Sequence, residues 1–496
     1  MWPMIFFCAC FLSISSACDF DPSSPLETGI VCRVTKPAAL VLNEQTAQVI
    51  QAAFRHASYP DINGEKAIRF FGQVTYGLTN IQISNLTIGS SEVELREDDA
   101  VYIMIKNVSA SFSGTLSYGY GAWFMKVGQT IDFEIDSSTD LQINTKLTCG
   151  NNRVAADTSD CYLTFHKLVL HLYGDKQPGW LKQLFTDFIS FTLKLVLKRQ
   201  ICKEINYVAN LLADFIQDKA EDFLRDGDIG VDISVTSFPV IKAGYMESRH
   251  KGAVLYRKPS DIFNSSLYTP SLLSENRMLY FWFSEHVLNS MAQASFFDGR
   301  LELKLTGSEL KDILKDDDTE SHEANQKIFH GLSLSNSVTK IWSLTPPEIR
   351  ITPEGTIVTS SVAVQLNSTL STESQVVGLY FETDVTATVK ASYADKKLIL
   401  NLSDSIVHIK TCTSSLQTSA KEKEIRQFLH KTISLYGIAA VMKRMEPALT
   451  SLMNSKGLNL FDIINPEIIH HKGYLIVQLD FGFPHHLLVD FLKKAL

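Results

Sequence analysis

The stretch from Pro178 to Leu224 constrains the fold most, because its apolar side chains recur at helical spacing over about 47 residues. Steps of three and four separate Trp180, Leu181, Leu184, Phe185, Phe188, Phe191, Leu195 and Val196. Lys182, Asp187, Lys194 and Lys198 fall between them. No run reaches the roughly 18 uncharged apolar residues of a membrane-spanning helix. The pattern predicts a long amphipathic helix that packs on the protein's own sheet, as in an ordinary core, or on a bound lipid.

The first 17 residues predict secretion. A short apolar run from Met4 to Leu12 is followed by Ser15-Ser16-Ala17, which has the small-x-small pattern of a signal-peptide cleavage site. Cleavage there leaves Cys18, Cys32, Cys149, Cys161, Cys202 and Cys412 in an oxidising compartment. Six cysteines allow fifteen disulfide connectivities, so the sequence by itself does not pair them. Five N-x-S/T acceptors also fit secretion, and they are Asn85, Asn107, Asn264, Asn367 and Asn401.

The charge balance narrows the range of partners. The chain has 46 Lys and Arg residues against 54 Asp and Glu residues, a net charge of −8. A net-acidic protein is a poor candidate for binding nucleic acid or an anionic bacterial surface.

Strand patterns dominate the rest of the chain. Ile131, Phe133 and Ile135 alternate with acidic residues, and Leu141 and Ile143 alternate with Gln142 and Asn144. This period of two puts one face of each strand in water and the other in the core. Long amphipathic strands in series predict curved antiparallel sheets.

The order of elements repeats along the chain. A first helix is predicted at about 43–58 and the long helix at 178, about 135 residues later. A second helix begins at 284, and another long helix at 421, about 137 residues later. The predicted domains are a signal peptide (1–17), an N-terminal domain (18–256), a linker (257–276), a C-terminal domain (277–483) and a terminal helix (484–496). Residues 315–323 are expected to form a solvated loop.

Catalytic motifs are missing from the sequence. It has no nucleophile elbow, H-E-x-x-H motif, Walker loop or dinucleotide-binding glycine pattern. Ser248 and His250 share one face of a predicted strand, but no orienting acid or oxyanion hole accompanies them. The pairs His470-His471 and His485-His486 lack further ligands at metal-binding spacing. The sequence therefore predicts neither an enzyme nor a metal site.

Several short sequence motifs resemble those of a known protein family. They are Gly29-Ile-Val-Cys-Arg-Val-Thr-Lys-Pro37, Pro178-Gly-Trp-Leu-Lys-Gln-Leu-Phe185, Ile189-Ser-Phe-Thr-Leu-Lys-Leu-Val-Leu197, Asp226-Gly-Asp-Ile-Gly-Val-Asp232, Arg277-Met-Leu-Tyr-Phe-Trp-Phe283 and Phe461-Asp-Ile-Ile-Asn-Pro466. With them the chain resembles the lipid-transfer and lipopolysaccharide-binding protein family from about residue 29 to its end, least clearly between about 300 and 350.

The resemblance implies an α+β fold. The expected molecule is elongated, with two curved barrel-like antiparallel domains that carry long amphipathic helices, a central sheet between them and an apolar tunnel. It implies a secreted plasma protein, a monomer, that moves neutral lipid (cholesteryl ester or triglyceride) and phospholipid between high-density and lower-density lipoprotein particles. Bound lipid and no other cofactor is expected, because such exchange needs no covalent chemistry.

The resemblance also implies roles for particular residues. Gln217, Lys219, Ser248 and His250 are expected to face phospholipid head groups at the tunnel openings. Lys219 stands where the family has an arginine, so a bidentate phosphate contact becomes a point charge. Phe281 and Phe283 are expected to line the tunnel, although plain core packing would bury them too. A disulfide is expected between Cys161 and Cys202, which leaves Cys18, Cys32, Cys149 and Cys412 as free or buried thiols.

The last residues form a second candidate element. Leu487, Leu488, Phe491 and Leu492 fall on one face of a helix that can begin at Pro484. The resemblance implies a plug over the N-terminal tunnel opening, and a terminal helix packed only for stability is the alternative.

Three functional alternatives remain from the sequence. A lipopolysaccharide or bacterial-surface binder should carry a basic N-terminal half, and an esterase would need an activated nucleophile. Transfer of phospholipid alone is the closest rival.

Overall fold

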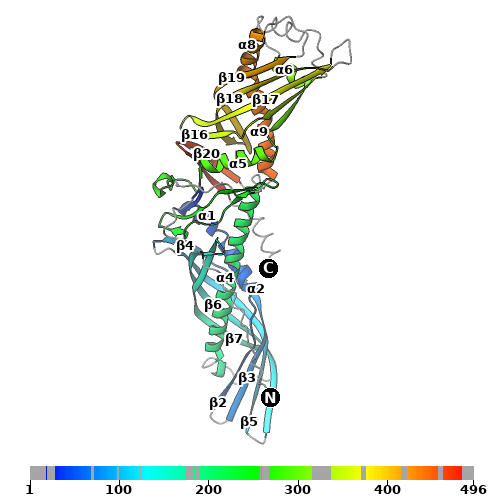
Figure 1. Ribbon diagram of the computed structural model, residues 1–496. Coiled ribbons are helices and arrows are strands. Elements are labelled where there is room, and N and C mark those ends of the chain that lie inside the picture. The colour runs from blue at the N-terminus through cyan, green and yellow to red at the C-terminus, as the bar shows by residue number, and fades with distance from the viewer. Residues whose placement is uncertain are drawn as a thin grey trace, which may run out of the picture.

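The computed structural model describes residues 18, 28–68, 72–97, 100–122, 125–173, 183–185, 189–256, 258–259, 267–314, 337–369, 376–414, 422–455 and 462–482. Within them the protein is elongated, with one large sheet towards each end and a smaller sheet between them (Figure 1). This arrangement confirms the α+β class and the two curved antiparallel sheets with a central sheet between them. The predicted loop at 315–323, the sequon at Asn264, His485-His486 and the helix at 484–496 lie outside the described residues.

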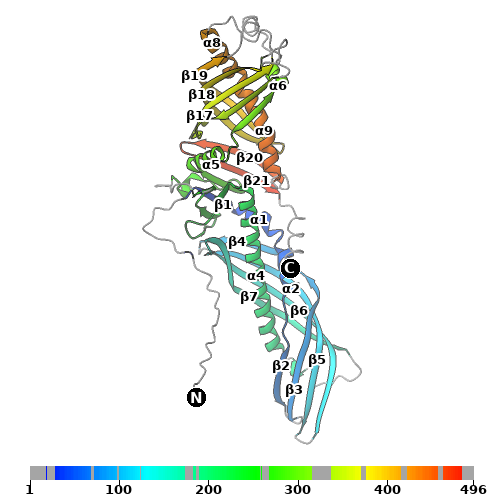
Figure 2. The same ribbon diagram turned by 45° about the vertical axis from the view of Figure 1, so that its right-hand side comes forward.

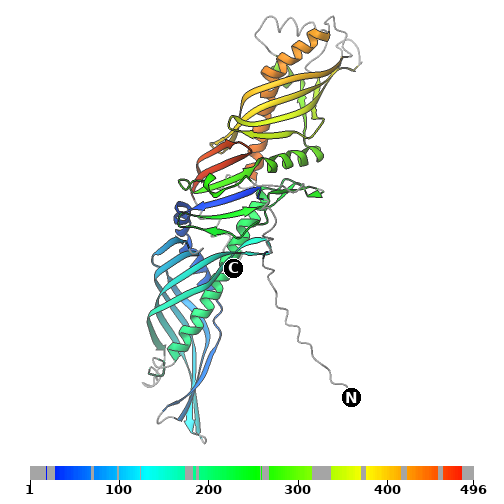
Figure 3. The same ribbon diagram turned by 60° about the vertical axis from the view of Figure 1, so that its left-hand side comes forward.

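The N-terminal sheet is built from long antiparallel strands. In spatial order they are β2 (Ile62–Ile68), β3 (Gly72–Thr87), β5 (Ala100–Ala122), β6 (Met125–Gly150) and β7 (Arg153–Tyr173), with β4 (Ser91–Arg96) paired to β5. The predicted alternation holds in β6, where Phe133, Ile135, Leu141 and Ile143 are buried. Helix α4 (Ser190–Phe223) covers this buried face, as Figures 2 and 3 show from two sides. Leu193, Leu197, Ile201, Ile205 and Val208 of α4 are its buried apolar residues.

The C-terminal sheet repeats this plan. Its strands are β14 (Glu302–Thr306), β15 (Val338–Ser343), β17 (Gly355–Thr369), β18 (Val376–Ala394) and β19 (Lys397–Ser414), with β16 (Glu348–Thr352) paired to β17. The long helix predicted at 421–454 is divided into α8 (Glu422–Thr432), a π-helical segment (Ile433–Gly437) and α9 (Ile438–Ser455). Pro447 lies inside α9. The short helix α6 (Gly307–Leu314) follows β14.

The central sheet joins segments from both halves of the chain. Its order is β20 (Asp462–His471), β21 (Tyr474–Gly482), β13 (Leu279–Ser284), β1 (Ile30–Thr35), β10 (Tyr245–His250) and β9 (Val240–Ile241). Helix α5 (Glu285–Phe297) follows β13, and a small neighbouring sheet contains β8 (Gly230–Asp232), β11 (Ala253–Tyr256) and β12 (Lys258–Pro259). Because β1 pairs with β10 and β13, strands more than 200 residues apart in sequence become neighbours.

The helix predicted at about 43–58 is confirmed as α2 (Thr46–His56). An additional short helix that was not predicted, α1 (Lys36–Asn43), precedes it. Pro37 occupies the first turn of α1, where its missing N–H costs nothing. The expected linker at 257–276 includes β12 and a 3₁₀ turn at Pro270–Leu272 in its described parts.

The disulfides correct one prediction and confirm another. Cys161 is bonded to Cys202, as expected, and this bond ties β7 to α4. Cys18 is bonded to Cys149, so the expectation that both stay as thiols is wrong. The expectation holds for the other two cysteines, because Cys32 and Cys412 are free thiols.

Candidate lipid-binding face

The candidate site is one face of the central sheet. In the antiparallel register Cys32 of β1 lies between Ser248 of β10 and Phe281 of β13. Ile30 lies in the same way between His250 and Phe283. Directly opposed residues share a face, so these six side chains lie on one side of the sheet, together with Val477 and Leu475 of β21. We call this set the lipid-face residues.

The opposite side of the same strands is an ordinary packed core. Val31, Tyr280, Trp282 and Ile476 are buried there. By contrast, Phe281 and Phe283 are only half-buried, although their rings stack with centroids 6.2 Å apart. The two phenylalanines are therefore less enclosed than the residues on the opposite side, although Phe283 packs against the buried cluster that contains Ile30 and Val287.

Cys32 lies in the middle of the lipid face, between Ser248 and Phe281. Burial raises the pKa of its thiol to about 12, with a smaller contribution from the Glu247 carboxylate. The residue nevertheless keeps part of its surface accessible. Burial therefore keeps this free thiol in its neutral form.

Ser248 and His250 form a hydrogen-bonded pair at the edge of this face. His250 Nδ1 lies 2.6 Å from the carbonyl oxygen of Ile233, and this oxygen can only accept, so Nδ1 carries a proton. Burial lowers the pKa of His250, which favours a neutral ring. Nε2 then accepts a hydrogen bond from Ser248 Oγ at 2.8 Å. The predicted pair is therefore assembled, with a serine hydroxyl directed at an imidazole nitrogen.

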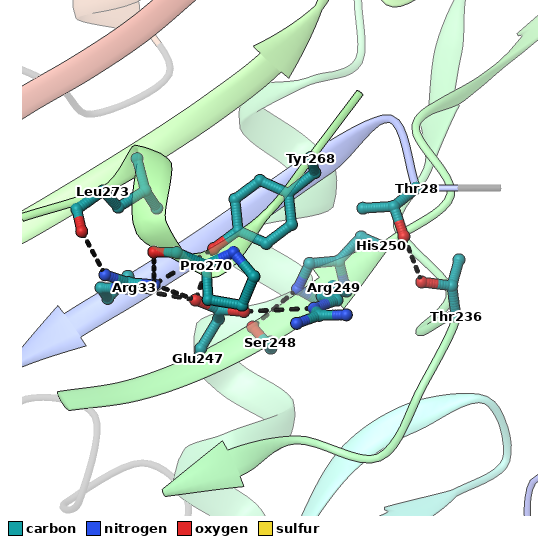
Figure 4. Close-up of polar contacts among 10 residues, drawn as sticks. All are labelled: Thr28, Arg33, Thr236, Glu247, Ser248, Arg249, His250, Tyr268, Pro270 and Leu273. Carbon is teal, nitrogen blue, oxygen red and sulfur yellow. Dashed lines mark hydrogen bonds and ion pairs between the residues drawn. The ribbon is translucent and has the colours of Figure 1, made fainter. Parts of the chain in front are cut away.

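A buried ion pair fixes which way Ser248 and His250 point. Arg33 and Glu247 lie directly opposite each other on β1 and β10, and Arg33 donates to Glu247 Oε2 from Nη2 at 2.6 Å and from Nε at 3.0 Å. Arg33 also donates to the carbonyl oxygens of Pro270 and Leu273, and Tyr268 donates to Glu247 (Figure 4). A slip of one residue in β10 would bury Ser248 and expose Glu247, so this network holds the register.

Gln217 and Lys219 lie apart from that pair, on α4. Gln217 is buried, and its amide bonds the backbone of Val154 in β7 in both directions, at 2.8 and 2.9 Å. Its Nε2 also donates to the carbonyl oxygen of Ala213, so a phosphate could reach this nitrogen only if one of these bonds broke. Lys219 is 61% exposed and lies 3.5 Å from Asp222. Among the described residues no hydrogen bond joins either one to Ser248 or His250.

The seam between α4 and β7 is a feature that the sequence did not reveal. β7 is an edge strand, and three amide side chains of α4 satisfy its free backbone groups: Asn206 bonds Thr158, Asn210 bonds Ala156 and Gln217 bonds Val154. The C-terminal half does the same, because Thr450 and Glu446 of α9 accept from the N–H groups of Leu398 and Leu400 in β19. Covering an edge in this way prevents pairing with other chains. The only sequence signal was polar residues interrupting an apolar helix stripe.

The other features that bear on function are metal ligands, membrane-spanning helices and the histidine pair His470-His471. No group of His, Cys, Asp and Glu able to hold a metal ion occurs there. No helix in that part of the chain is long and apolar enough to cross a membrane. His471, of the pair His470-His471, lies on β20, and its ring stacks on that of Tyr474 with centroids 4.8 Å apart.

The geometry defines a class: an elongated α+β protein with a central antiparallel sheet between two helix-covered antiparallel sheets. Models of the LBP / BPI / CETP family match this chain, the N-terminal domain over residues 39–214 and the C-terminal domain over residues 224–483. The chain belongs to this family.

Individual relatives match nearly the whole chain. The cholesteryl ester transfer protein of Gallus gallus is 56% identical over 484 residues, which are 97% of this chain and 96% of that protein. The cholesteryl ester transfer protein of Homo sapiens is 53% identical over 472 residues, 94% and 95% of the two chains. The phospholipid transfer protein of Mus musculus is 22% identical over 466 residues, 92% and 90% of the two chains.

Proposed function

We propose that this chain is a secreted lipid-transfer protein that carries neutral lipid and phospholipid between lipoprotein particles. The observation that carries the proposal is the half-buried apolar row on this face, formed by Phe281, Phe283, Leu475 and Val477, with the Ser248–His250 pair beside it. The identity to cholesteryl ester transfer proteins favours cholesteryl ester or triglyceride as the neutral lipid.

A protein carrier is needed because neutral lipid does not diffuse through water. At about 0.8 kcal/mol per buried methylene, exposure of thirty apolar carbons costs more than roughly 20 kcal/mol. An apolar tunnel that runs over the lipid-face residues would remove this cost. Exchange through it breaks no covalent bond, so no catalytic group is required.

Phospholipid is the second ligand that the proposal assigns. A phosphate that approaches Ser248 can accept a hydrogen bond from its hydroxyl group, and a protonated His250 could then donate a hydrogen bond from Nε2 to Ser248 Oγ. A head group therefore fits at the edge of the lipid face while acyl chains lie against Phe281 and Phe283. Gln217 and Lys219 remain predicted head-group contacts, and Leu487, Leu488, Phe491 and Leu492 remain predicted plug residues.

Organic extraction of the purified protein and mass spectrometry of the extract test the proposal. Cholesteryl ester or triglyceride together with phospholipid is the expected content. Phospholipid without neutral lipid would instead support the rival, transfer of phospholipid alone. A protein that carries no lipid and moves no fluorescent cholesteryl ester between lipid emulsions would contradict the proposal.

A pair of variants separates the two ligands. Ser248→Leu with His250→Leu should lower the phospholipid content and leave neutral lipid in place. Met246→Leu, on the same strand and the same face, is the matched control and should leave both contents unchanged. Equal phospholipid content in all three proteins would remove the head-group role.

A further inference from the structure

Helix α4 carries opposite charge in its two parts. Residues 190–203 contain Lys194, Lys198, Arg199 and Lys203 and no carboxylate, a net charge of +4. Residues 204–223 contain five carboxylates and one lysine, a net charge of −4. The helix dipole favours the reverse order, with acidic residues at the start and basic residues at the end. A charge order that does not help the helix indicates a role outside it.

The basic part also exposes apolar side chains in one row. Phe191, Leu195, Arg199, Lys203 and Tyr207 follow one another at every fourth residue, and all five are exposed. The exposed fractions of Phe191, Leu195 and Tyr207 are 65%, 54% and 48%. We call these five residues the α4 stripe.

The acidic and basic parts of α4 differ in whether their charged side chains form ion pairs. In the acidic part, Arg153 lies within 4 Å of carboxylate oxygens of Asp214, Asp218 and Glu221. In the part of the chain that the structure describes, Arg199 and Lys203 form no ion pair. The stripe therefore presents uncompensated positive charge beside exposed apolar groups.

The other side of the N-terminal sheet has the opposite character. There β6 exposes carboxylates towards solvent, with Asp136 paired to His171 and Asp140 paired to His166. The predicted glycan acceptors Asn85 and Asn107 are exposed on the same sheet. That side of the sheet is therefore less suited to an anionic surface than the side covered by α4.

We propose that the α4 stripe lies on the anionic phospholipid surface from which the protein collects its lipid. Phe191 and Leu195 enter the head-group layer, while Arg199 and Lys203 contact phosphates. Exposed apolar groups flanked by cations are typical of helices that lie in a membrane interface. The net charge of −8 does not oppose this, because screening at physiological salt acts over about 8 Å and makes the local charge decisive. The inference rests on the proposed function, since it locates where that exchange begins.

Vesicle co-sedimentation of the full chain tests the stripe. The probes are vesicles of phosphatidylcholine alone and vesicles that also contain about 30% phosphatidylserine, an anionic lipid content at which each bound basic side chain contributes about fivefold in affinity. Wild-type protein should prefer the anionic vesicles, and added salt should reduce this preference. Arg199→Glu with Lys203→Glu should lower affinity for them at least about 20-fold. Phe191→Ser with Leu195→Ser should lower binding to both vesicle types.

The matched control is Lys146→Glu with Lys167→Glu. These two lysines are exposed on β6 and β7, outside the stripe, and their reversal changes net charge by the same amount. The control should bind anionic vesicles within about threefold of wild type, well short of the loss that removal of two bound cations causes. Equal losses in the stripe variant and the control would overturn the proposal, as would a stripe variant that binds like wild type.

Two further readouts keep the outcome interpretable. The amount of extracted lipid should be unchanged in the stripe variants. A variant that loses vesicle binding but keeps its normal lipid content would show that the α4 stripe acts in surface binding and not in lipid storage. Wild-type protein without lipid would instead count against the proposed function. Sedimentation velocity reports self-association, and a dimer that the stripe variants dissociate, with vesicle binding intact, would make the stripe a contact between two copies and overturn the proposal.

Discussion

Gln217 and Val154 are joined by two hydrogen bonds, because one side-chain amide meets both backbone groups of one edge-strand residue. Gln217→Met keeps the length of the side chain and leaves the Val154 N–H and C=O without these partners. The free energy of unfolding should fall by about 2 kcal/mol, the cost of leaving buried polar groups unsatisfied. Denaturant unfolding measures this loss.

Lys219→Met is the control for this variant, since Lys219 is two residues away and 61% exposed. A surface substitution there should change stability by less than about 0.5 kcal/mol. If both variants were equally stable, the seam between α4 and β7 would not depend on the amide of Gln217.

The strands and the long helix were predictable because their signals are local. The alternation of Ile131, Phe133 and Ile135 already separates the two faces of β6, and all that it needs is a period of two. The helical spacing that predicts α4 is also local. It did not identify the buried face correctly, because Phe191 and Leu195 are exposed and Leu193 is buried instead.

The features that could not be predicted from the sequence depend on contacts between residues that are far apart along the chain. Cys18 and Cys149 are 131 residues apart, and the sequence around either cysteine does not identify its disulfide partner. Asn206 and Asn210 look like breaks in an apolar stripe until β7 lies beside them. Ser248 and His250 could be placed on one face by alternation, but their contact with Ile233 needed the folded chain.

The ion pair between Arg33 and Glu247 should be costly to break. Both side chains are 2% exposed, so Glu247→Gln leaves the Arg33 charge buried without its counter-charge. The expected loss of unfolding free energy is about 3 to 5 kcal/mol. Glu348→Gln removes the same kind of charge from an Arg–Glu pair that is 66% exposed on both sides, and its effect should stay below about 1 kcal/mol. Similar losses in the two variants would show that the buried pair does not hold the sheet.

The two disulfides should differ in what they contribute. Cys161–Cys202 closes a separation of 41 residues and Cys18–Cys149 one of 131, so the chain-entropy model assigns about 4 and about 5 kcal/mol. Non-reducing peptide mapping should recover both bonds, with Cys32 and Cys412 as thiols. Recovery of Cys18 and Cys149 as thiols would contradict the disulfide between these two residues.

The last prediction concerns pH and His250. Burial lowers its pKa in the folded protein, while the unfolded chain keeps a value of about 6.5. Below that value the unfolded state binds more protons than the folded state, so this group destabilises the fold as pH falls and has no such effect above about pH 7.5. Asp232 opposes the shift but does not reverse its direction. The pH dependence of thermal unfolding between about pH 7.5 and 5.5 should therefore become shallower in His250→Gln. His430→Gln, on the exposed face of α8, is the control for loss of a histidine at the protein surface. An unaltered profile in His250→Gln would mean that the imidazole accepts a proton in the folded protein as readily as in water, and the Ser248 hydroxyl would then face an imidazolium.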